Sequence, residues 1–319
     1  MSAQEEVSFV VEGGKPLSGS VLTNRSKNGA VALLAGSLLN KGTTTLHNVP
    51  KIEEVHRLVE VLESLGVLAI WDDHTLTITP PTSINLETID TVAAMRTRSI
   101  LMFIGPLVHQ FKHFDIPQSG GCTLGLRSVR PHLWALERFG ISIETLENRF
   151  KVSHSALTPA EVILYESSDT ATINALYAAS KINGTSVIKY ASANYQVQEV
   201  CGYLERLGVT ISGIGSTTLT VTGVSEIDVA VEYTIAEDPT DAMFFIAAAA
   251  TTGSAITVLR APIEFLEVEL AILRKWECSL RLLPEGFPKM ELQNSQISQL
   301  RLERSKPFLK RFTLARTLD

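Results

Sequence analysis

The sequence predicts an α/β protein in which βαβαββ units repeat along the chain. The first observation behind this prediction is a helix end that recurs at intervals close to seventy residues. The four ends are Gly66, Gly140, Gly208 and Glu277. Glycine directly after a helix commonly adopts the left-handed conformation of a C-cap, so Glu277 departs from the pattern.

The second observation is an apolar helix that starts each unit. Residues 27–39, 170–181 and 239–251 are rich in Ala and Leu and carry little charge. Helices of this composition are expected to be buried on most sides. A further helix is predicted at 99–107, with Arg98 at its start.

The third observation is the order of strands around the amphipathic helices. Glycine-led strands are predicted at 42–47, 184–188 and 253–259, ahead of these helices. Strands with alternating side chains follow them, as at Thr75–Thr79 and 218–222. The most apolar run, 242–259, is broken by Thr251-Thr252-Gly253-Ser254 and therefore indicates a helix that turns into a strand rather than a membrane span.

Four units begin near residues 27, 98, 170 and 239, and the fourth lacks a convincing final strand pair. From Gln293 the sequence becomes rich in Gln, Ser and Arg, and residues 301–319 are strongly basic. This end of the chain is expected to be disordered or loosely attached.

Composition excludes several classes of protein. The 319 residues are 45% hydrophobic and 19% charged, with a net charge of −6, so a nucleic-acid-binding surface has little electrostatic support. Cys122, Cys201 and Cys278 show no CxxC spacing, which favours a reducing cytoplasm over a disulfide framework. The acidic N-terminus lacks the pattern of a signal peptide.

A glycine-rich segment at 117–132 is the first candidate for chemistry. Gly120, Gly121 and Gly125 surround Cys122, and Arg127 follows closely. A thiol near fixed positive charge loses its proton more easily, so the segment indicates a mobile lid whose Cys acts as acid or nucleophile. An ordinary glycine-rich connection with an inert Cys is the alternative.

A second candidate is an anion site at helix N-termini. Lys27 and Asn28 open one apolar helix and Arg98 opens another, and free N–H groups at a helix start attract phosphate or carboxylate. Lys27, Arg98 and Arg127 recur near corresponding edges of units, where they could converge on one anion. A Lys that only solubilises a helix end is the alternative.

Several segments resemble the UDP-N-acetylglucosamine enolpyruvyl transferases. The resemblance runs from about residue 8 to 285 and is strongest before residue 145. The segments that carry it are Gly-Gly-Lys-Pro-Leu-Ser-Gly at 13–19, Ser-Lys-Asn-Gly-Ala at 26–30, Asn-Val-Pro-Lys at 48–51, Gly-Pro-Leu-Val at 105–108, Gly-Gly-Cys-Thr-Leu-Gly-Leu-Arg at 120–127 and Leu-Glu-Arg-Leu-Gly at 204–208.

The resemblance implies transfer of the enolpyruvyl group of phosphoenolpyruvate to the 3-hydroxyl of UDP-N-acetylglucosamine, an early step of bacterial peptidoglycan synthesis, without a cofactor or metal. It implies an inside-out α/β barrel fold of two domains, each with three βαβαββ units. Residues 27–236 would form a complete domain, and 1–26 with 237–319 an incomplete one. An incomplete domain could associate with itself or with a complementary subunit.

The family's functional residues transfer by position. Lys27 and Asn28 would contact phosphoenolpyruvate and the sugar nucleotide, and Arg98 and Arg127 would clamp the anionic substrate. Cys122 would be the lid thiol, which fosfomycin alkylates in the family. The uridine diphosphate would lie at the helix start formed by Ser168, Asp169 and Thr170, and Asp238 matches a nucleotide-binding segment.

The departures from the family keep alternatives open. Arg130 stands where the family has an Asp, and Asn194-Tyr195-Gln196 replaces an acidic turn. The family's general base, an Asp, has no counterpart after residue 285, so slow turnover is expected. A non-catalytic or partner-dependent homologue that binds a UDP-sugar is one alternative, and the related 3-phosphoshikimate enzyme is another.

Overall fold

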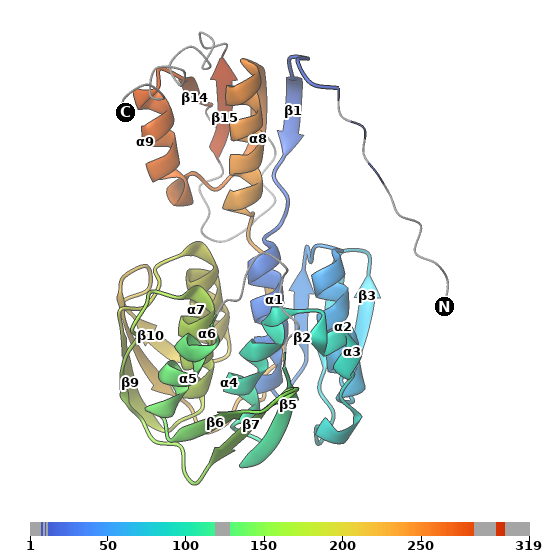
Figure 1. Cartoon of the computed structure of the whole chain (residues 1–319), viewed down its shortest axis with the longest axis vertical. Helices are drawn as coiled ribbons and strands as arrows, with labels where there is room; N and C mark the ends of the chain where they lie inside the picture. The colour runs from blue at the N-terminus through green and yellow to red at the C-terminus, as the bar shows by residue number, and fades with distance from the viewer. Residues whose placement is uncertain (1–7, 9, 11, 119–127, 284–297, 304–319) are drawn as a thin grey trace. The chain divides into compact units, whose positions relative to one another are not determined.

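The computed structural model describes residues 8, 10, 12–118, 128–283 and 298–303. The chain divides into two compact units (Figure 1). The large unit is Arg25–Ala236, and the small unit combines Met1–Asn24 with Glu237–Asp319.

Apolar inner helices form the core of the large unit. They are α1 (Lys27–Gly36), continued by the 3-10 turn η1 (Ser37–Leu39), η3 (Arg98–Phe103), continued by α4 (Ile104–Leu107), and α6 (Asp169–Ser180). Every residue from Gly29 to Gly36 and from Ala171 to Ser180 is buried. The predicted burial of these two helices is therefore confirmed.

The helix predicted at 99–107 is α-helical only in its last turn, and the side chain of Asn174 explains why. In an α-helix the Gly105 N–H would donate to the Leu101 carbonyl. Here Gly105 N donates to Asn174 Oδ1 at 3.0 Å, and Asn174 Nδ2 donates to Leu101 O at 2.8 Å. Pro106 then offers no N–H of its own. Residues 98–103 therefore form a 3-10 helix.

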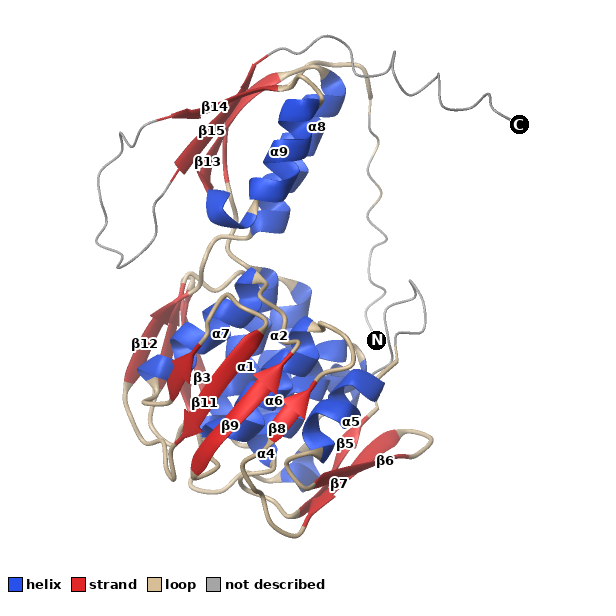
Figure 2. Ribbon diagram, turned by 90° about the vertical axis from the view of Figure 1, so that its left-hand side faces the viewer, coloured by secondary structure: helices blue, strands red, loops and turns tan. Residues whose placement is uncertain are grey.

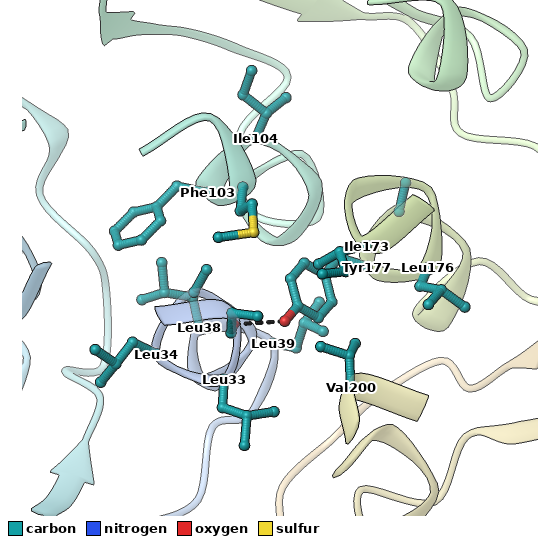
Figure 3. Close-up of a cluster of buried hydrophobic side chains, with 14 of the residues drawn as sticks. Leu33, Leu34, Leu38, Leu39, Phe103, Ile104, Ile173, Leu176, Tyr177 and Val200 are labelled. Atoms are coloured by element: carbon teal, nitrogen blue, oxygen red, sulfur yellow. Dashed lines mark hydrogen bonds between the residues drawn. The ribbon is translucent and has the colours of Figure 1, made fainter. Parts of the chain in front are cut away.

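Figure 3 shows how closely the inner helices pack. Tyr177 of α6 is fully buried and its Oη donates to the Ala32 carbonyl of α1 at 2.6 Å. A Cβ on Gly36 would lie 2.9 Å from Tyr177 Oη, and one on Gly105 would lie 2.7 Å from Tyr177 Cβ. Both positions require glycine because a larger residue would push α6 away.

Amphipathic outer helices cover this core. They are α2 (Glu53–Ser64), α5 (Arg130–Glu137) and α7 (Tyr195–Arg206), with short segments η2 (Leu86–Thr88) and α3 (Thr91–Met95) beside them. The predicted glycines follow all three helices with positive φ, at 91° for Gly66, 86° for Gly140 and 92° for Gly208.

The described strands form four sheets, and three of these share one order. Within each, the first strand is parallel to the second and the others are antiparallel. The orders are β12-β2-β4-β3, β8-β9-β11-β10 and β1-β13-β15-β14, and the fourth sheet is β5-β7-β6. Figure 2 shows β8, β9 and β11 lying over the helices of the large unit.

The strands of the large unit have the following bounds: β2 (Thr44–His47), β3 (Leu68–Asp72), β4 (Thr75–Thr79), β5 (His113–Pro117), β6 (Ile141–Thr145), β7 (Arg149–His154), β8 (Glu161–Ile163), β9 (Gly184–Lys189), β10 (Thr210–Ser212), β11 (Thr218–Gly223) and β12 (Val231–Thr234). Strand β12 returns from the end of the unit to pair with β2, which closes the unit.

The described part of the small unit forms one sheet with two α-helices on one face (Figure 2). Its elements are β1 (Ser18–Leu22), α8 (Pro239–Thr252), β13 (Ala255–Ala261), η4 (Ile263–Phe265), α9 (Glu267–Lys275), β14 (Ser279–Leu283) and β15 (Ser298–Glu303). The expectation that the fourth repeat lacks a final strand pair is wrong, because β14 and β15 pair antiparallel. Residues 284–297 separate the two strands, so no short hairpin signal marks them. The expectation of a disordered or loosely attached end is wrong for Ser298–Glu303, which form β15. Residues 304–319, the rest of that predicted tail, lie outside the described residues.

A further prediction for the small unit is wrong. Helix α8 is not buried on most sides: Phe244 is 67% exposed, because α8 packs one face on β13. Cys278 is buried between α9 and β14. Glu277, just before it, has φ 61° and so ends α9 in the left-handed conformation that glycine adopts elsewhere.

Within the described ranges, no helix has both the length and the apolar character needed to span a bilayer.

Candidate functional site

The candidate site is built from the N-termini of the three inner helices of the large unit. Each begins with a hydroxyl side chain that caps a backbone N–H. Ser26 Oγ accepts from Gly29 N at 2.8 Å, Thr97 Oγ1 from Ser99 N at 3.1 Å, and Ser168 Oγ from Ala171 N at 3.4 Å. The predicted residues Lys27, Arg98 and Thr170 follow these caps.

Glu54, in the first turn of α2, joins two of these helix starts. Its Oε2 lies 2.5 Å from Lys27 Nζ. Its Oε1 accepts hydrogen bonds from Thr97 Oγ1 at 2.7 Å and from Ser99 Oγ at 2.6 Å. One carboxylate thus contacts α1 and both residues that flank Arg98.

The electrostatics of the Glu54 carboxyl favour its ionised form. Burial by itself would raise its pKa, but hydrogen bonds from Lys27, Ser99 and Thr97 outweigh burial and hold the pKa below its usual range. No sequence pattern predicted a role for Glu54. An acidic residue in the first turn of a helix is explained by the helix dipole alone, so Glu53-Glu54 carried no sign of a distant partner.

Arg98 extends the cluster toward the glycine-rich segment. Its Nη2 donates to the Ser128 carbonyl at 2.8 Å. Cys122 and Arg127 themselves lie outside the described residues, which omit 119–127. The side chain of Arg98 is therefore hydrogen-bonded to the described C-terminal part of the glycine-rich segment, residues 128–132.

His132 of α5 contacts the start of α6 and lies near the Arg98 charge. Its Nδ1 lies 2.9 Å from Asn174 Nδ2, and its Nε2 lies 3.1 Å from Thr170 Oγ1. Because Gly105 N–H bonds Asn174 Oδ1, the amide orientation is determined and Nδ2 must be the donor. His132 Nδ1 therefore accepts, and its proton resides on Nε2, which donates to Thr170.

The protonation of His132 follows from its surroundings. Burial, with the nearby Arg98 cation adding to it, lowers the pKa of His132 to about 4. A neutral imidazole therefore holds the Thr170 oxygen, and the Thr170 hydroxyl keeps its own proton to donate elsewhere.

The other two predicted residues at the start of α6 hold the local structure. Ser168 is the N-cap of α6. The Asp169 carboxylate accepts from Ser192 Oγ and, at 3.1 Å, from Asn194 Nδ2. Asp169 thus ties α6 to the loop before α7, which makes its carboxylate a poor partner for a diphosphate.

Asn28 packs toward α7 instead of toward the Glu54 cluster. Its Nδ2 donates to Tyr195 Oη at 3.2 Å. Beside it, a Cβ on Gly29 would lie 1.7 Å from Glu199 Oε2, so α1 can approach α7 only with glycine at this position. The start of α1 is therefore tightly held.

The acidic residues near α8 are all engaged within the small unit. Asp238 is buried and caps α8 by accepting from Thr240 N at 2.8 Å. Asp241 accepts from Asn24 N at 2.8 Å, and Glu237 pairs with Arg260. These contacts give Asp238 a structural role at the point where the chain enters α8.

Arg130 lines a separate surface hollow of about 360 Å³ together with Leu133, Trp134, Glu137 and Tyr165. The rings of Trp134 and Tyr165 meet edge to face with centroids 5.8 Å apart. Arg130 is exposed and its charge therefore lies on the outer surface of α5.

Comparison with known proteins places this architecture in one family. The family profile described as EPSP synthase (3-phosphoshikimate 1-carboxyvinyltransferase) matches residues 11–303. The enolpyruvyl transferase NikO from Streptomyces tendae superposes with a TM-score of 0.75 at 19% identity, over 91% of this chain and 66% of that protein. EPSP synthase from Acinetobacter baumannii superposes with a TM-score of 0.68 at 17% identity, over 92% and 66%. These two structures share the fold.

Curated relatives are more similar in sequence. The UDP-N-acetylglucosamine 1-carboxyvinyltransferase of Chlorobaculum parvum is 34% identical over 85% of this chain and 64% of its own length. That of Bradyrhizobium diazoefficiens is 34% identical over 82% of this chain and 60% of its own length. The chain thus spans less than two thirds of the length of these relatives. On the match over 11–303, this chain belongs to the EPSP synthase family.

Proposed function

We propose that this chain takes part in transferring the enolpyruvyl group of phosphoenolpyruvate to the 3-hydroxyl of UDP-N-acetylglucosamine, a step in making peptidoglycan precursors. In this reaction the sugar oxygen forms a bond to C2 of phosphoenolpyruvate, the bond from C2 to the phosphate oxygen breaks, and inorganic phosphate carries away the hydroxyl proton. The printed names of the relatives at 34% identity support this substrate pair.

One observation carries the proposal: Glu54 contacts Lys27 and both neighbours of Arg98, so the starts of two inner helices from different repeats lie together. Both substrates are anions, so cations must offset their repulsion when they bind together. Arg suits a carboxylate or phosphate because its planar group can donate two parallel hydrogen bonds. Helix N-termini add partial positive charge at the same end.

The remaining roles follow from position. Thr170 and Ser168 would receive the diphosphate of the sugar nucleotide at the start of α6, with Asn28 nearby on α1. Cys122 would supply the lid thiol and Arg127 a further cation. Asp238, the cap of α8, would contact the nucleotide.

A phosphate-release assay tests the proposal. Purified protein is expected to release phosphate from phosphoenolpyruvate only when UDP-N-acetylglucosamine is present. Arg98→Ala should abolish this release, whereas Arg149→Ala, on the exposed face of β7 and paired with Asp115, should not. Release by wild type that does not depend on the sugar nucleotide would contradict the proposal.

The description of the matching family supports a second candidate function, transfer of the enolpyruvyl group to 3-phosphoshikimate. The same assay with 3-phosphoshikimate in place of the sugar nucleotide distinguishes the two. A third possibility, binding of a UDP-sugar without turnover, predicts a raised melting temperature with UDP-N-acetylglucosamine and no phosphate release.

A further inference from the structure

We propose that Glu54 is a positioning residue for the anion site: it fixes the Lys27 ammonium and the segment that carries Arg98, so that both serve one phosphate-bearing ligand. This inference rests on the proposed function and deepens it. It concerns a residue that neither the sequence motifs nor the names of the relatives single out.

The first support is the set of donors that Glu54 gathers. A carboxylate beside an anion site would repel the ligand unless its charge were compensated. Three donors meet it at 2.5–2.7 Å, from Lys27, Thr97 and Ser99. The carboxylate is thus compensated before any ligand arrives.

The second support is what these contacts immobilise. Lys27 is 49% exposed, and a lysine ammonium on a flexible stem loses rotamer freedom when a ligand binds it. Contact with Glu54, which is 23% exposed, orders the ammonium beforehand and reduces that loss on binding.

The third support is that Glu54 contacts both neighbours of Arg98. Thr97 Oγ1 both caps η3 and donates to Glu54, and Ser99 Oγ donates to the same oxygen. The backbone on either side of Arg98 is therefore attached to the residue that holds Lys27. Glu54 therefore links the Lys27 ammonium to the segment of chain that carries Arg98.

Selectivity between two anions tests this role. Glu54→Gln removes a negative charge, which by itself would strengthen binding of any anion. If Lys27 and Arg98 instead lose their relative placement, the affinity for the extended phosphoenolpyruvate should fall more than the affinity for the small, symmetrical inorganic phosphate. The ratio of the Kd for inorganic phosphate to the Kd for phosphoenolpyruvate separates these effects and is measurable by calorimetry without turnover.

We expect this ratio to fall about tenfold in Glu54→Gln, the equivalent of about 1.4 kcal/mol. Ser99→Ala, which removes one of the three donors, should give a smaller fall and decides the question if Glu54→Gln does not fold. The matched control is Glu53→Gln, on the same turn of α2, whose 71% exposed carboxylate pairs with Arg57. The control should leave the ratio unchanged.

The outcomes are separable. An unchanged ratio in Glu54→Gln and Ser99→Ala overturns the role of Glu54. Wild-type protein that binds phosphoenolpyruvate but releases no phosphate with UDP-N-acetylglucosamine overturns the proposed function alone. Wild-type protein that binds neither anion overturns both.

Discussion

Asn174 Nδ2 donates to His132 Nδ1 at 2.9 Å, although the two residues lie 42 positions apart and on different helices. The same amide donates to the Leu101 carbonyl and accepts from the Gly105 N–H, two groups that would bond each other in an α-helix. One side chain thus interrupts the backbone hydrogen bonding between η3 and α4 and sets the tautomer of a buried histidine.

Replacing Asn174 should therefore destabilise the large unit strongly. Asn174→Leu keeps the volume but removes the amide, leaving buried polar groups on α4, η3 and α5 without their partner. Each such group costs about 1–3 kcal/mol, so a loss of about 3 kcal/mol or more is expected in urea unfolding. Asn183→Ala, at an exposed position after α6, is the control and should change stability little. A loss in Asn174→Leu no larger than in the control would contradict this assignment.

Stability should fall between pH 6.5 and pH 4. Burial lowers the pKa of both His109 and His132 to about 4, so the unfolded chain binds more protons than the folded one in this range. Their contribution is complete above pH 6.5 and is lost as the pH falls through this window, on the order of 3 kcal/mol for each residue.

Urea unfolding across this window measures the effect. His132→Gln should have a shallower dependence on pH than wild type, whereas His113→Gln, at an exposed position of β5, should retain the wild-type dependence. Parallel profiles for all three proteins would show that His132 is not held neutral.

Two helix-ending glycines should differ in their tolerance of alanine. Gly208 has φ 92° and a Cβ there meets nothing within 4 Å, so Gly208→Ala should cost about 1 kcal/mol from the backbone conformation alone. Gly140 has φ 86°, but its Cβ would lie 2.8 Å from the Ala156 carbonyl oxygen. Gly140→Ala should therefore lower the melting temperature more. Equal losses would mean that the loop at Ala156 yields freely.

Cys122 should be the thiol that iodoacetamide alkylates first. Cys201 is fully buried, and burial, with the Glu205 charge adding to it, raises its pKa to about 12. Cys278 is only 6% exposed. Thiolates react and thiols do not, so both should label slowly. Peptide mass analysis after brief labelling measures this, with Cys122→Ser as the control that should lose the fast reaction. Early labelling of Cys201 would contradict the structure.

The repeat and its helices were predictable because they depend on local patterns. Glycine after a helix and an Ala- and Leu-rich run each act within a few residues. Glu277 shows that residue type alone does not identify every helix end, because it adopts the left-handed conformation at φ 61° although it is not glycine. The position in the repeat, and not the residue type, was the reliable signal.

The exposure of α8 depended on tertiary structure. Helices α1 and α8 are both rich in apolar residues, yet α1 is buried from Gly29 to Gly36 while Phe244 of α8 is 67% exposed. What surrounds a helix is decided by elements distant in the chain, and composition does not contain that information.

The sequence by itself determined the α/β repeat, the residues that open the inner helices, and the family resemblance, since all of these reside in short segments. Only the tertiary structure decided that Glu54 contacts both Lys27 and Ser99, which lies 45 positions after Glu54. It also decided that the Asn174 side chain accepts the Gly105 N–H. Such contacts arise when folding brings distant segments together. A carboxylate or amide has the same local pattern whether its partner is water or a buried helix end.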